Sequence, residues 1–266
     1  MLNMKFIGII PARYASTRFP GKPLADLGGK PMIQRVYEQA KQVLDTVIVA
    51  TDDERIYNCV YEFGGDVVMT SPYHACGTDR VYEAYQHYCA NSAQPIDHQD
   101  TVVINIQGDE PFIQPDQIQA LMGCFPTEIA TLVHPFTEKD TIADLQNPNY
   151  VKVAIAHEDN ELNNDIIGCA MYFSRSVIPY LRGISLEEWL KQGRHFRHIG
   201  MYAYRADILK RITQISPSPL EQMECLEQLR WLENGLTIRV AKTNHASIGI
   251  DTPADLEYAL TLLNTK

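Results

Sequence analysis

Up to Gln107 the chain alternates short apolar runs with amphipathic stretches, and this alternation constrains the fold more than any other feature. The apolar runs are KFIGII (5–10), TVIVAT (46–51), DVVMT (66–70) and TVVINIQ (101–107). The stretches between them are PMIQRVYEQAKQV (31–43), ERIYNCVYEFG (54–64) and DRVYEAYQHYC (79–89). Such a pattern is typical of βαβ units around a parallel sheet. We therefore expect an α/β fold with a Rossmann-like, mostly parallel sheet flanked by helices.

The pattern changes after about residue 129, where several strand-like runs follow one another with little helix between the first three. These runs are ATLVHPF (130–136), YVKVAIA (150–156), CAMYFSR (169–175) and HIGMYAYRA (198–206). We expect a smaller mixed β extension within residues 129–211. A helix is predicted over 220–233, then a strand over 236–243, then a last strand and helix in SIGIDTPADLEYALTLL (247–263) that rejoin the first sheet. No repeat or linker interrupts the chain, so residues 1–266 are predicted to form a single α/β domain.

Composition narrows the classes of function. The 266 residues carry a net charge of -10, which argues against nucleic-acid binding and against attraction to an anionic membrane. The first apolar run is too short for a secretion signal or a membrane span, so we expect a cytoplasmic protein with no membrane insertion. The six cysteines form no CxxC pair and are expected to be reduced core thiols. An anionic ligand would need a local basic site.

The loop after the first strand provides such a site. Between Arg13 and Lys30 four basic residues stand against one acidic residue, and Arg13, Arg18 and Lys22 lie among prolines and a glycine. Ligands of parallel sheets bind beyond the carboxyl ends of the strands, which is where this loop begins. The segment matches neither GxxxxGK[ST] nor GxGxxG, which disfavours P-loop kinases and dinucleotide-binding dehydrogenases. The competing interpretation is a solvated basic loop.

Two carboxylates are predicted to meet at the same edge of the sheet. Asp109 follows the apolar run TVVINIQ, and Asp251 ends the run SIGI far along the chain. If these runs are neighbouring strands, the two side chains suit Mg²⁺, which takes one or two carboxylates plus substrate phosphates. Gly108 would allow the backbone to approach a ligand closely. The competing interpretation of Asp251 is a helix N-cap, and Asp52 and Asp53 are expected to be a solvated helix start.

Seven segments in order along nearly the whole chain resemble the motifs of the 3-deoxy-manno-octulosonate (Kdo) cytidylyltransferase family of Gram-negative bacteria. They are PARYASTRFPGKPL, GTDR, NIQGDEP, YFSR, RHIGMYAYRA, PSPLEQMECLEQLR and IDTPADL. The resemblance implies a fold of the nucleotide-diphospho-sugar transferase type and transfer of CMP from CTP to Kdo in lipopolysaccharide biosynthesis. It also implies Mg²⁺ as cofactor and a homodimer, whose interface we expect in residues 129–211.

The same resemblance implies roles for individual residues. Arg13, Arg18, Lys22 and Arg80 are expected to bind the triphosphate, and Asp109 and Asp251 to bind Mg²⁺. Arg18, Lys22, Asp109 and Asp251 are the expected catalytic residues. The residues expected on the sugar side are Gln107, Ser174, Arg175, His198, Tyr202, Glu227 and Gln228. The chain departs from the family pattern before YFSR, where the segment beginning at His157 is longer and more polar.

Simpler interpretations of the sugar-side residues stay open. His195 and His198 form an HxxH pair, but no third zinc ligand is evident, and a polar histidine beside a strand is commoner. Tyr202 and Tyr204 alternate along a strand, so only one of them is expected to face the ligand if the other packs. Glu227 and Gln228 lie in an amphipathic stretch whose ordinary interpretation is a solvated helix face.

Three other functions compete with Kdo cytidylyltransfer. A sialic acid cytidylyltransferase would share the basic loop but lack RHIGMYAYR and PSPLEQ, and different acidic sugars would distinguish the two. A nucleotide-binding protein without catalysis would not need both Asp109 and Asp251. A glycosyltransferase can share the sheet and an acidic metal site, but the basic loop fits a free triphosphate better.

Overall fold

The computed structural model describes residues 4–15, 18–157, 165–246 and 248–264. The longer segment before YFSR falls mostly on residues 158–164, which lie outside the described part. The chain divides into two compact units, one of residues 1–118, 205–213 and 247–266 and one of residues 119–204 and 214–246. We call them unit 1 and unit 2 and describe each by itself. The predicted organisation as a single domain with a subregion over 129–211 stays a prediction.

Unit 1 contains a four-stranded parallel sheet in the order β3-β2-β1-β4. Its strands are β1 (Lys5–Ala12), β2 (Thr46–Thr51), β3 (Asp66–Met69) and β4 (Thr101–Asn105). The helices between them are α1 (Met32–Lys41), α2 (Glu54–Glu62) and α3 (Gly77–Ala90), and α6 (Ala206–Ile212) and α9 (Pro253–Asn264) come from later in the chain. A short 3₁₀ helix, η1 (Lys22–Leu24), follows the first loop, and the division between the units falls within α4 (Pro115–Met122).

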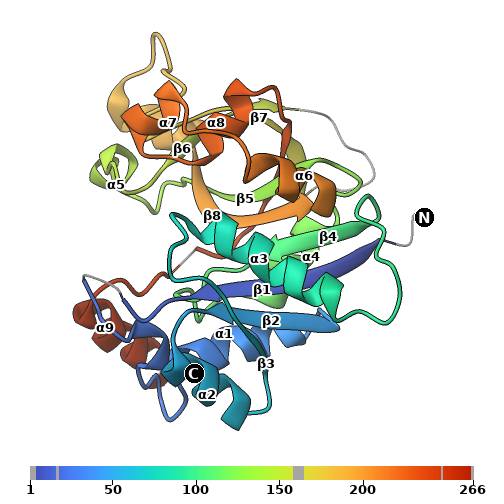
Figure 1. Ribbon diagram of the computed structural model, residues 1–266. Helices are drawn as coiled ribbons and strands as arrows, with labels where there is room; N and C mark the ends of the chain where they lie inside the picture. The colour runs from blue at the N-terminus through green and yellow to red at the C-terminus, as the bar shows by residue number, and fades with distance from the viewer. Residues whose placement is uncertain (1–3, 16–17, 158–164, 247, 265–266) are drawn as a thin grey trace. The chain divides into compact units, whose positions relative to one another are not determined.

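The strands of unit 1 are buried because helices cover them. All of β4 and most of β1 and β2 are inaccessible to solvent, which fits their nearly continuous apolar sequences. Figure 1 shows α3 lying across β1 and β4. The parallel register pairs Ala12 with Thr51 and Ile9 with Asn105, so the loops after β1, β2 and β4 leave the same edge of the sheet. The predicted parallel α/β fold with flanking helices is confirmed here.

Unit 2 contains a mixed sheet, as predicted, but one of its strands, Ile238–Lys242, comes from outside the expected range 129–211. Its strands are β5 (Ile129–Pro135), β6 (Lys152–His157), β7 (Ile166–Ser174), β8 (Phe196–Arg205) and β9 (Ile238–Lys242). They follow the order β8-β5-β9-β7-β6, with β5 and β9 parallel and the other neighbours antiparallel. Unit 2 also contains α5 (Ile142–Gln146), the 3₁₀ helix η2 (Leu186–Gln192), α7 (Pro219–Glu224) and α8 (Gln228–Glu233). A separate core of Phe136, Leu145 and Trp189 packs beside the sheet.

Two predictions of secondary structure are wrong. The helix expected over 220–233 is two helices, α7 and α8, because Cys225 takes a left-handed conformation with φ 51° that ends the first. The strand expected before Asp251 is absent, since residues 248–250 belong to no strand. Ile250 is nevertheless fully buried, in a cluster with Leu27, Met32 and Ala259. The end of the chain therefore rejoins unit 1 through α9 and this cluster.

The cysteines and the helices bear on two further expectations. All six cysteines are free thiols, but Cys124 is buried while Cys225 is exposed, so the expected core position is wrong for Cys225. Among the helices in the described part of the chain, none is both long and apolar enough to span a bilayer.

Candidate active site

A polar cavity of about 390 Å³ opens in unit 1 at the carboxyl ends of its strands. The loop after β1 contributes Arg13, Arg18 and Lys22, the loop after β4 contributes Gln107 and Asp109, and α3 contributes Arg80. Asp251 lines the same cavity. The structure thus brings together every residue that was expected to bind the triphosphate or the metal, along with Gln107 from the sugar side. The same edge of the sheet was predicted because parallel strands place their following loops there.

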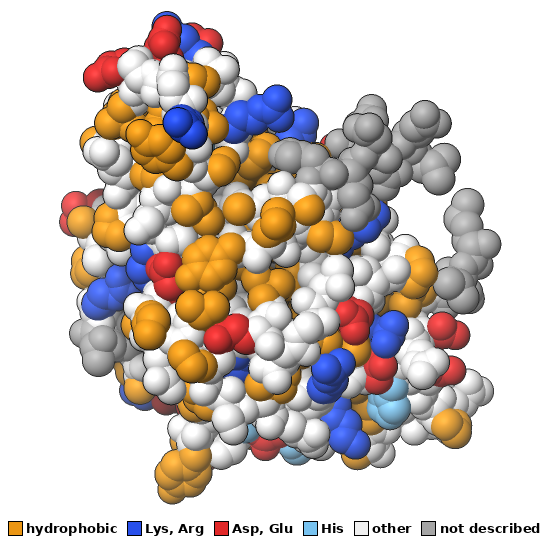
Figure 2. Space-filling model, turned by 90° about the horizontal axis from the view of Figure 1, so that it is seen from above, with side chains coloured by type: hydrophobic (Ala, Val, Ile, Leu, Met, Phe, Trp, Pro, Cys, Tyr) orange, Lys and Arg blue, Asp and Glu red, His pale blue; other side chains and the backbone are white. Residues whose placement is uncertain are grey.

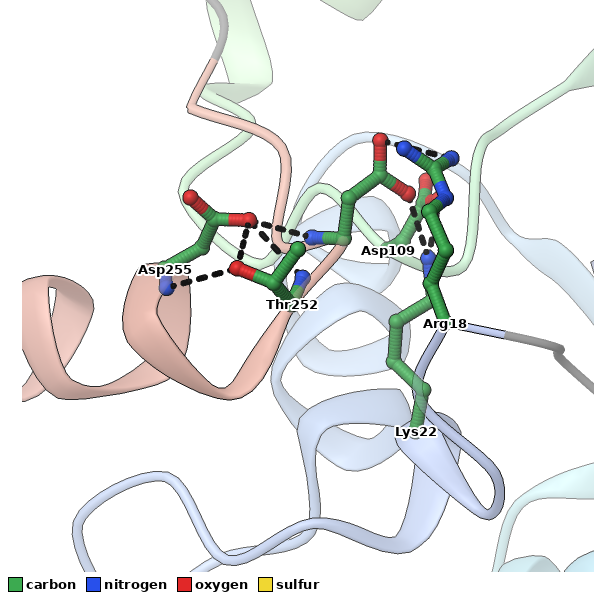
Figure 3. Close-up of polar contacts among 6 residues, drawn as sticks. Arg18, Lys22, Asp109, Thr252 and Asp255 are labelled. Carbon is green, nitrogen blue, oxygen red and sulfur yellow. Dashed lines mark hydrogen bonds and ion pairs between the residues drawn. The ribbon is translucent and has the colours of Figure 1, made fainter.

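Lys22 lies between the two carboxylates. Its Nζ atom is 2.7 Å from Oδ2 of Asp109 and 3.1 Å from Oδ1 of Asp251. An Nη atom of Arg18 lies 3.1 Å from the other carboxylate oxygen of Asp251. The Lys22 side chain is 13% exposed, whereas those of Asp109 and Asp251 are 35% and 46% exposed. Figure 3 shows Lys22 extending from its loop toward Asp109 beneath the guanidinium of Arg18. The two carboxylates therefore reach one cationic centre.

A backbone hydrogen bond brings Asp251 to this place, without a strand. The amide of Ile250 donates to the carbonyl of Asp109 at 2.9 Å. The helix that follows is capped by Thr252 and Asp255: the Asp255 carboxylate accepts from the amides of Asp251 and Thr252 at 3.0 and 2.8 Å (Figure 3). The Asp255 amide donates in turn to the Thr252 hydroxyl at 3.3 Å. The interpretation of Asp251 as the N-cap is therefore wrong, and its carboxylate is directed to the two cations.

Arg80 is held in the cavity wall by two residues that directly follow the strands β2 and β3. Its side chain is 6% exposed, and it donates to Oδ2 of Asp52 at 2.7 Å and to the hydroxyl of Thr70 at 2.5 Å. Asp53, by contrast, caps α2 by accepting from the Arg55 amide at 2.9 Å. The prediction of a helix start is confirmed for Asp53. Sequence reasoning missed the role of Asp52, because its partner Arg80 comes from a different helix.

Two glycines shape the loops around the cavity. A Cβ atom on Gly108 would lie 3.0 Å from the backbone oxygen of Pro11, so the close neighbour that Gly108 admits is the first strand. Gly21, with φ 71°, lies against the ring of Tyr14 and precedes Lys22 at the start of η1. The guanidinium of Arg55 stacks 3.2 Å from the centre of the same ring. These contacts support the loop that carries Lys22.

The sugar-side candidates Ser174 and Arg175 lie in unit 2 and are bound to α7. Ser174 donates to Oε1 of Glu224 at 2.6 Å, and the Arg175 amide donates to Oε2 at 2.9 Å. The Arg175 side chain donates to the backbone oxygens of Glu224, Pro148 and Cys225 at 2.7, 3.0 and 3.3 Å. Glu224 was not singled out from the sequence. These bonds join β7 to α7, which gives both candidates a structural role.

His198 and Tyr202 lie in an aromatic cluster of unit 2. Nε2 of His198 is 3.0 Å from the hydroxyl of Thr131, and burial lowers the pKa of His198 to about 3. His198 is therefore neutral at physiological pH. Tyr202 and Tyr204 stack on each other, and both rings pack against Trp231 at 5.0 and 5.6 Å. The contrast expected between the two tyrosines is wrong: both rings pack, because residues i and i+2 of a strand share a face.

Gln228 and Glu227 stand at the start of α8. Gln228 is buried, which contradicts the interpretation as a solvated face, and its Nε2 has no hydrogen-bond partner within the described residues. Glu227 is half-buried and lies 3.6 Å from Arg230. The two histidines of the HxxH pair have different partners: His195 contacts the carbonyl of Pro179 at 3.0 Å, and His198 contacts Thr131. No cluster of three or more His, Cys, Asp or Glu side chains suited to a metal occurs in the described ranges.

Comparisons with known proteins identify the family of the chain. Residues 7–238 match the family described as Cytidylyltransferase. The chain is 59% identical to a 3-deoxy-manno-octulosonate cytidylyltransferase of Parabacteroides distasonis over 98% of both chains. It is 54% identical to one of Bacteroides thetaiotaomicron over 99% of this chain and all of that one. The chain belongs to the 3-deoxy-manno-octulosonate cytidylyltransferase family.

Solved structures support the fold of this cytidylyltransferase, and one of them also supports its family. The structure of CMP:2-keto-3-deoxy-manno-octonic acid synthetase complexed with CTP matches with a TM-score of 0.82 and 40% identity, over 98% of this chain and 99% of that one. A 4-diphosphocytidyl-2C-methyl-D-erythritol synthase from Anaerococcus prevotii matches with a TM-score of 0.56 at 13% identity, which shows the fold alone. The expected nucleotide-sugar transferase fold is confirmed.

Proposed function

We propose that this cytidylyltransferase transfers CMP from CTP to the anomeric hydroxyl of Kdo and releases pyrophosphate, as a step of lipopolysaccharide biosynthesis. The observation that carries the proposal is the cavity of unit 1, which four cationic side chains line together with the carboxylates of Asp52, Asp109 and Asp251. Full-length similarity to proteins named for this reaction supports it.

The nucleotide side of the reaction falls to Arg13, Arg18, Lys22 and Arg80. A triphosphate carries several negative charges, and a local cluster of cations can bind it on a chain whose net charge is -10. Arg80, fixed by Asp52 and Thr70, offers a preorganised guanidinium, whereas Arg18 is 65% exposed and free to adjust. We propose that Arg18 and Lys22 neutralise the charge that develops on the departing pyrophosphate.

Asp109 and Asp251 fit a divalent cation. They offer hard oxygen ligands, they are open to the cavity, and the Lys22 ammonium already demonstrates that both reach one cationic group. Two carboxylates leave most of the coordination to water and phosphate, which is the usual arrangement for Mg²⁺. Bound there, Mg²⁺ would polarise phosphate and hydroxyl oxygens. We propose Mg²⁺ as the cofactor of these two residues.

The sugar side is proposed to include Gln107, Ser174, Arg175, His198, Tyr202, Glu227 and Gln228. The buried Gln228 supports the proposal best, because a buried amide nitrogen without a partner is costly unless a ligand or water satisfies it. His198 is neutral, so it would orient a sugar hydroxyl and could not pair with the sugar carboxylate as a cation. The sugar hydroxyl attacks the α-phosphorus directly, and no covalent enzyme intermediate is needed.

A homodimer in the cytoplasm is part of the proposal. Among the described residues of unit 2, Met171 and Tyr180 within 129–211 expose large apolar side chains, as does Met223 outside that range. Figure 2 looks from above onto the side where Figure 1 draws β7, α7 and α8, and hydrophobic side chains gather across that face. Exposed apolar surface of this kind marks interaction sites, and a second copy of the chain is the partner that we propose, bound through residues 129–211.

Pyrophosphate release tests the proposed function. The protein is incubated with Mg²⁺ and each of the four nucleoside triphosphates, with and without Kdo. The expected result is release only with CTP and Kdo together. Equal release without Kdo, or none with it, would overturn the proposal, and a preference for sialic acid over Kdo would move the chain to the neighbouring activity.

A further inference from the structure

The four charged groups at the end of the cavity balance one another. Asp109 and Asp251 carry two negative charges, and the contacting Lys22 and Arg18 carry two positive charges. Of the four carboxylate oxygens, three lie within 3.1 Å of a cationic nitrogen. In this state the two carboxylates attract a divalent cation much less than two free carboxylates would.

Lys22 also takes up the place that a shared metal ion would need. Its Nζ atom contacts both carboxylates, Asp109 at 2.7 Å and Asp251 at 3.1 Å. A Mg²⁺ held by both carboxylates would need oxygens that Lys22 now contacts, at the shorter ligand distances of about 2.0 to 2.1 Å. Ammonium and metal therefore exclude each other.

The carboxylates are anchored, whereas the cations can move. The backbone of Asp109 is tied to Ile250 at 2.9 Å, and the Asp251 amide is tied to Asp255 at 3.0 Å. Lys22 and Arg18 reach the carboxylates with long, flexible side chains, and the Arg18 pair is exposed enough that water and salt weaken it. The part of the site that moves is thus the pair of cations.

The adjoining cavity offers the cations an alternative partner. Arg13 and Arg80 line it together with Lys22 and Arg18, and Arg80 is already fixed by Asp52. A triphosphate in this cavity would present oxygens with more negative charge than the two carboxylates. Charge-assisted hydrogen bonds to phosphate would replace the ion pairs that Lys22 and Arg18 lose when they leave the carboxylates.

We propose that Lys22 and Arg18 exchange partners when a nucleoside triphosphate binds: they leave Asp109 and Asp251 for phosphate oxygens, and the freed carboxylates then bind the divalent cation. The inference rests on the proposed function for the identity of the nucleotide. Triphosphate and cation consequently strengthen each other's binding, and the free protein binds the cation weakly. Lys22 is then both a triphosphate ligand and the group that closes the metal site.

Binding of Mn²⁺ to the full chain without nucleotide tests the cation half of the exchange. Free Mn²⁺ is measured by electron paramagnetic resonance for the wild type and for Lys22→Met, which keeps length but removes charge. Lys22→Met should bind Mn²⁺ about 10-fold more tightly or better, within the usual range of coupling between sites. The control is Lys30→Met, since Lys30 pairs with Glu38 at 2.7 Å elsewhere. The double variant Lys22→Met with Asp109→Asn should lose the gain.

Arg18→Gln gives an independent arm, because a side chain that is 65% exposed is replaced without risk to folding. It should tighten Mn²⁺ binding by about 2- to 5-fold, less than Lys22→Met, since Arg18 contacts one carboxylate. Equal Mn²⁺ affinity for the wild type, Lys22→Met and Arg18→Gln would overturn the proposal.

Titration with CTP in excess chelator tests the nucleotide half. Without metal, Asp109→Asn should bind CTP about 5-fold more tightly than the wild type, since Lys22 is then released to the phosphates. If Asp109→Asn tightens CTP binding only by removing repulsion between the carboxylate and the phosphates, the gain in affinity should remain in the double variant with Lys22→Met. The exchange predicts that this gain disappears in the double variant, and a gain that remains would contradict it. Neither binding test uses Kdo or turnover. A failure to form CMP-Kdo with these affinities as expected would therefore overturn the function and leave the exchange standing.

Discussion

The backbone amide of Ile250 donates to the backbone carbonyl of Asp109 at 2.9 Å, and this hydrogen bond places Asp251 beside Asp109. Ile250 itself is fully buried against Leu27, Met32 and Ala259. The position of Asp251 therefore depends on an apolar anchor on one side and the Thr252 and Asp255 cap on the other. The Asp251 carboxylate does not cap the helix, and it contacts the cations of the cavity instead.

Asp251 and Asp255 should separate function from stability. Asp251→Asn should lower CMP-Kdo formation about 100-fold or more, because a charged ligand of the metal and of two cations is lost. The unfolding temperature should hardly change, since α9 is capped by its neighbours. Asp255→Ala should do the opposite: it removes the acceptor of three hydrogen bonds and should cost about 1 to 2 kcal/mol of unfolding free energy.

Initial rates and thermal unfolding of the two variants, measured side by side, check this pair. Asp255→Ala should retain activity within about 10-fold of the wild type at a temperature where it is folded. Near-normal activity of Asp251→Asn at low Mg²⁺ would contradict the metal role of Asp251.

Asp52 and its neighbour Asp53 should also differ. Asp52→Asn removes the charge that balances the buried Arg80 and should cost about 2 to 3 kcal/mol of unfolding free energy, while the KM for CTP rises about 10-fold. Asp53→Asn is the matched control, because Asn caps a helix as well as Asp and its partner Arg55 is 60% exposed, whereas Arg80 is 6% exposed. Its effect on stability should stay below about 1 kcal/mol.

Steady-state kinetics with CTP varied at saturating Kdo distinguishes the two variants. The same KM for CTP in both would mean that Asp52 serves only the fold, and that Arg80 does not depend on it to meet the nucleotide.

Periodicity and the loops after strands, which are local features, predicted the parallel sheet and the cavity residues Arg13, Arg18, Lys22, Asp109 and Asp251. Arg80 was expected there only through the family resemblance. The sequence did not predict how Asp251 is delivered. The segment SIGI resembles a strand because its isoleucines alternate. Ile250 is instead buried by side-chain packing, and its backbone makes one hydrogen bond to Asp109 rather than the repeated hydrogen bonds of a strand pair. The role of Asp52 was missed for a related reason, as it depends on a tertiary contact with Arg80.

The break between α7 and α8 has the same kind of cause. An amphipathic pattern runs through 220–233 without a proline or glycine, so the sequence predicts one helix. The bonds from Ser174 and Arg175 to Glu224 come from a distant strand, and the chain turns at Cys225 directly after them. No pattern in the segment itself records those partners.

Lys152 should make stability depend on pH in the alkaline range. It is buried between the carbonyls of Asn147 and Arg175 at 3.0 and 2.6 Å, and burial lowers its pKa to about 8. Its pKa in the unfolded chain is about 10.4. Between these values the unfolded state binds more protons, so the contribution of Lys152 to folding becomes more favourable as the pH rises from 8 to 10.4.

The comparison is with Lys152→Met, which does not titrate. The unfolding free energy of the wild type minus that of Lys152→Met should increase by about 2 to 3 kcal/mol between pH 7 and pH 10.5. Denaturant unfolding at several pH values measures it. If the difference in unfolding free energy stays constant or falls as the pH rises, burial does not lower the pKa of Lys152.

Kdo labelled with ¹⁸O at the anomeric hydroxyl tests the central claim most directly. The labelled sugar is incubated briefly with CTP, Mg²⁺ and the protein, and products are analysed by mass spectrometry, with the label remaining in free Kdo measured in parallel. If the sugar hydroxyl attacks the α-phosphorus, CMP-Kdo carries the label in its bridging oxygen and pyrophosphate carries none. Absence of CMP-Kdo, or unlabelled CMP-Kdo formed from sugar that is still labelled, would contradict the account.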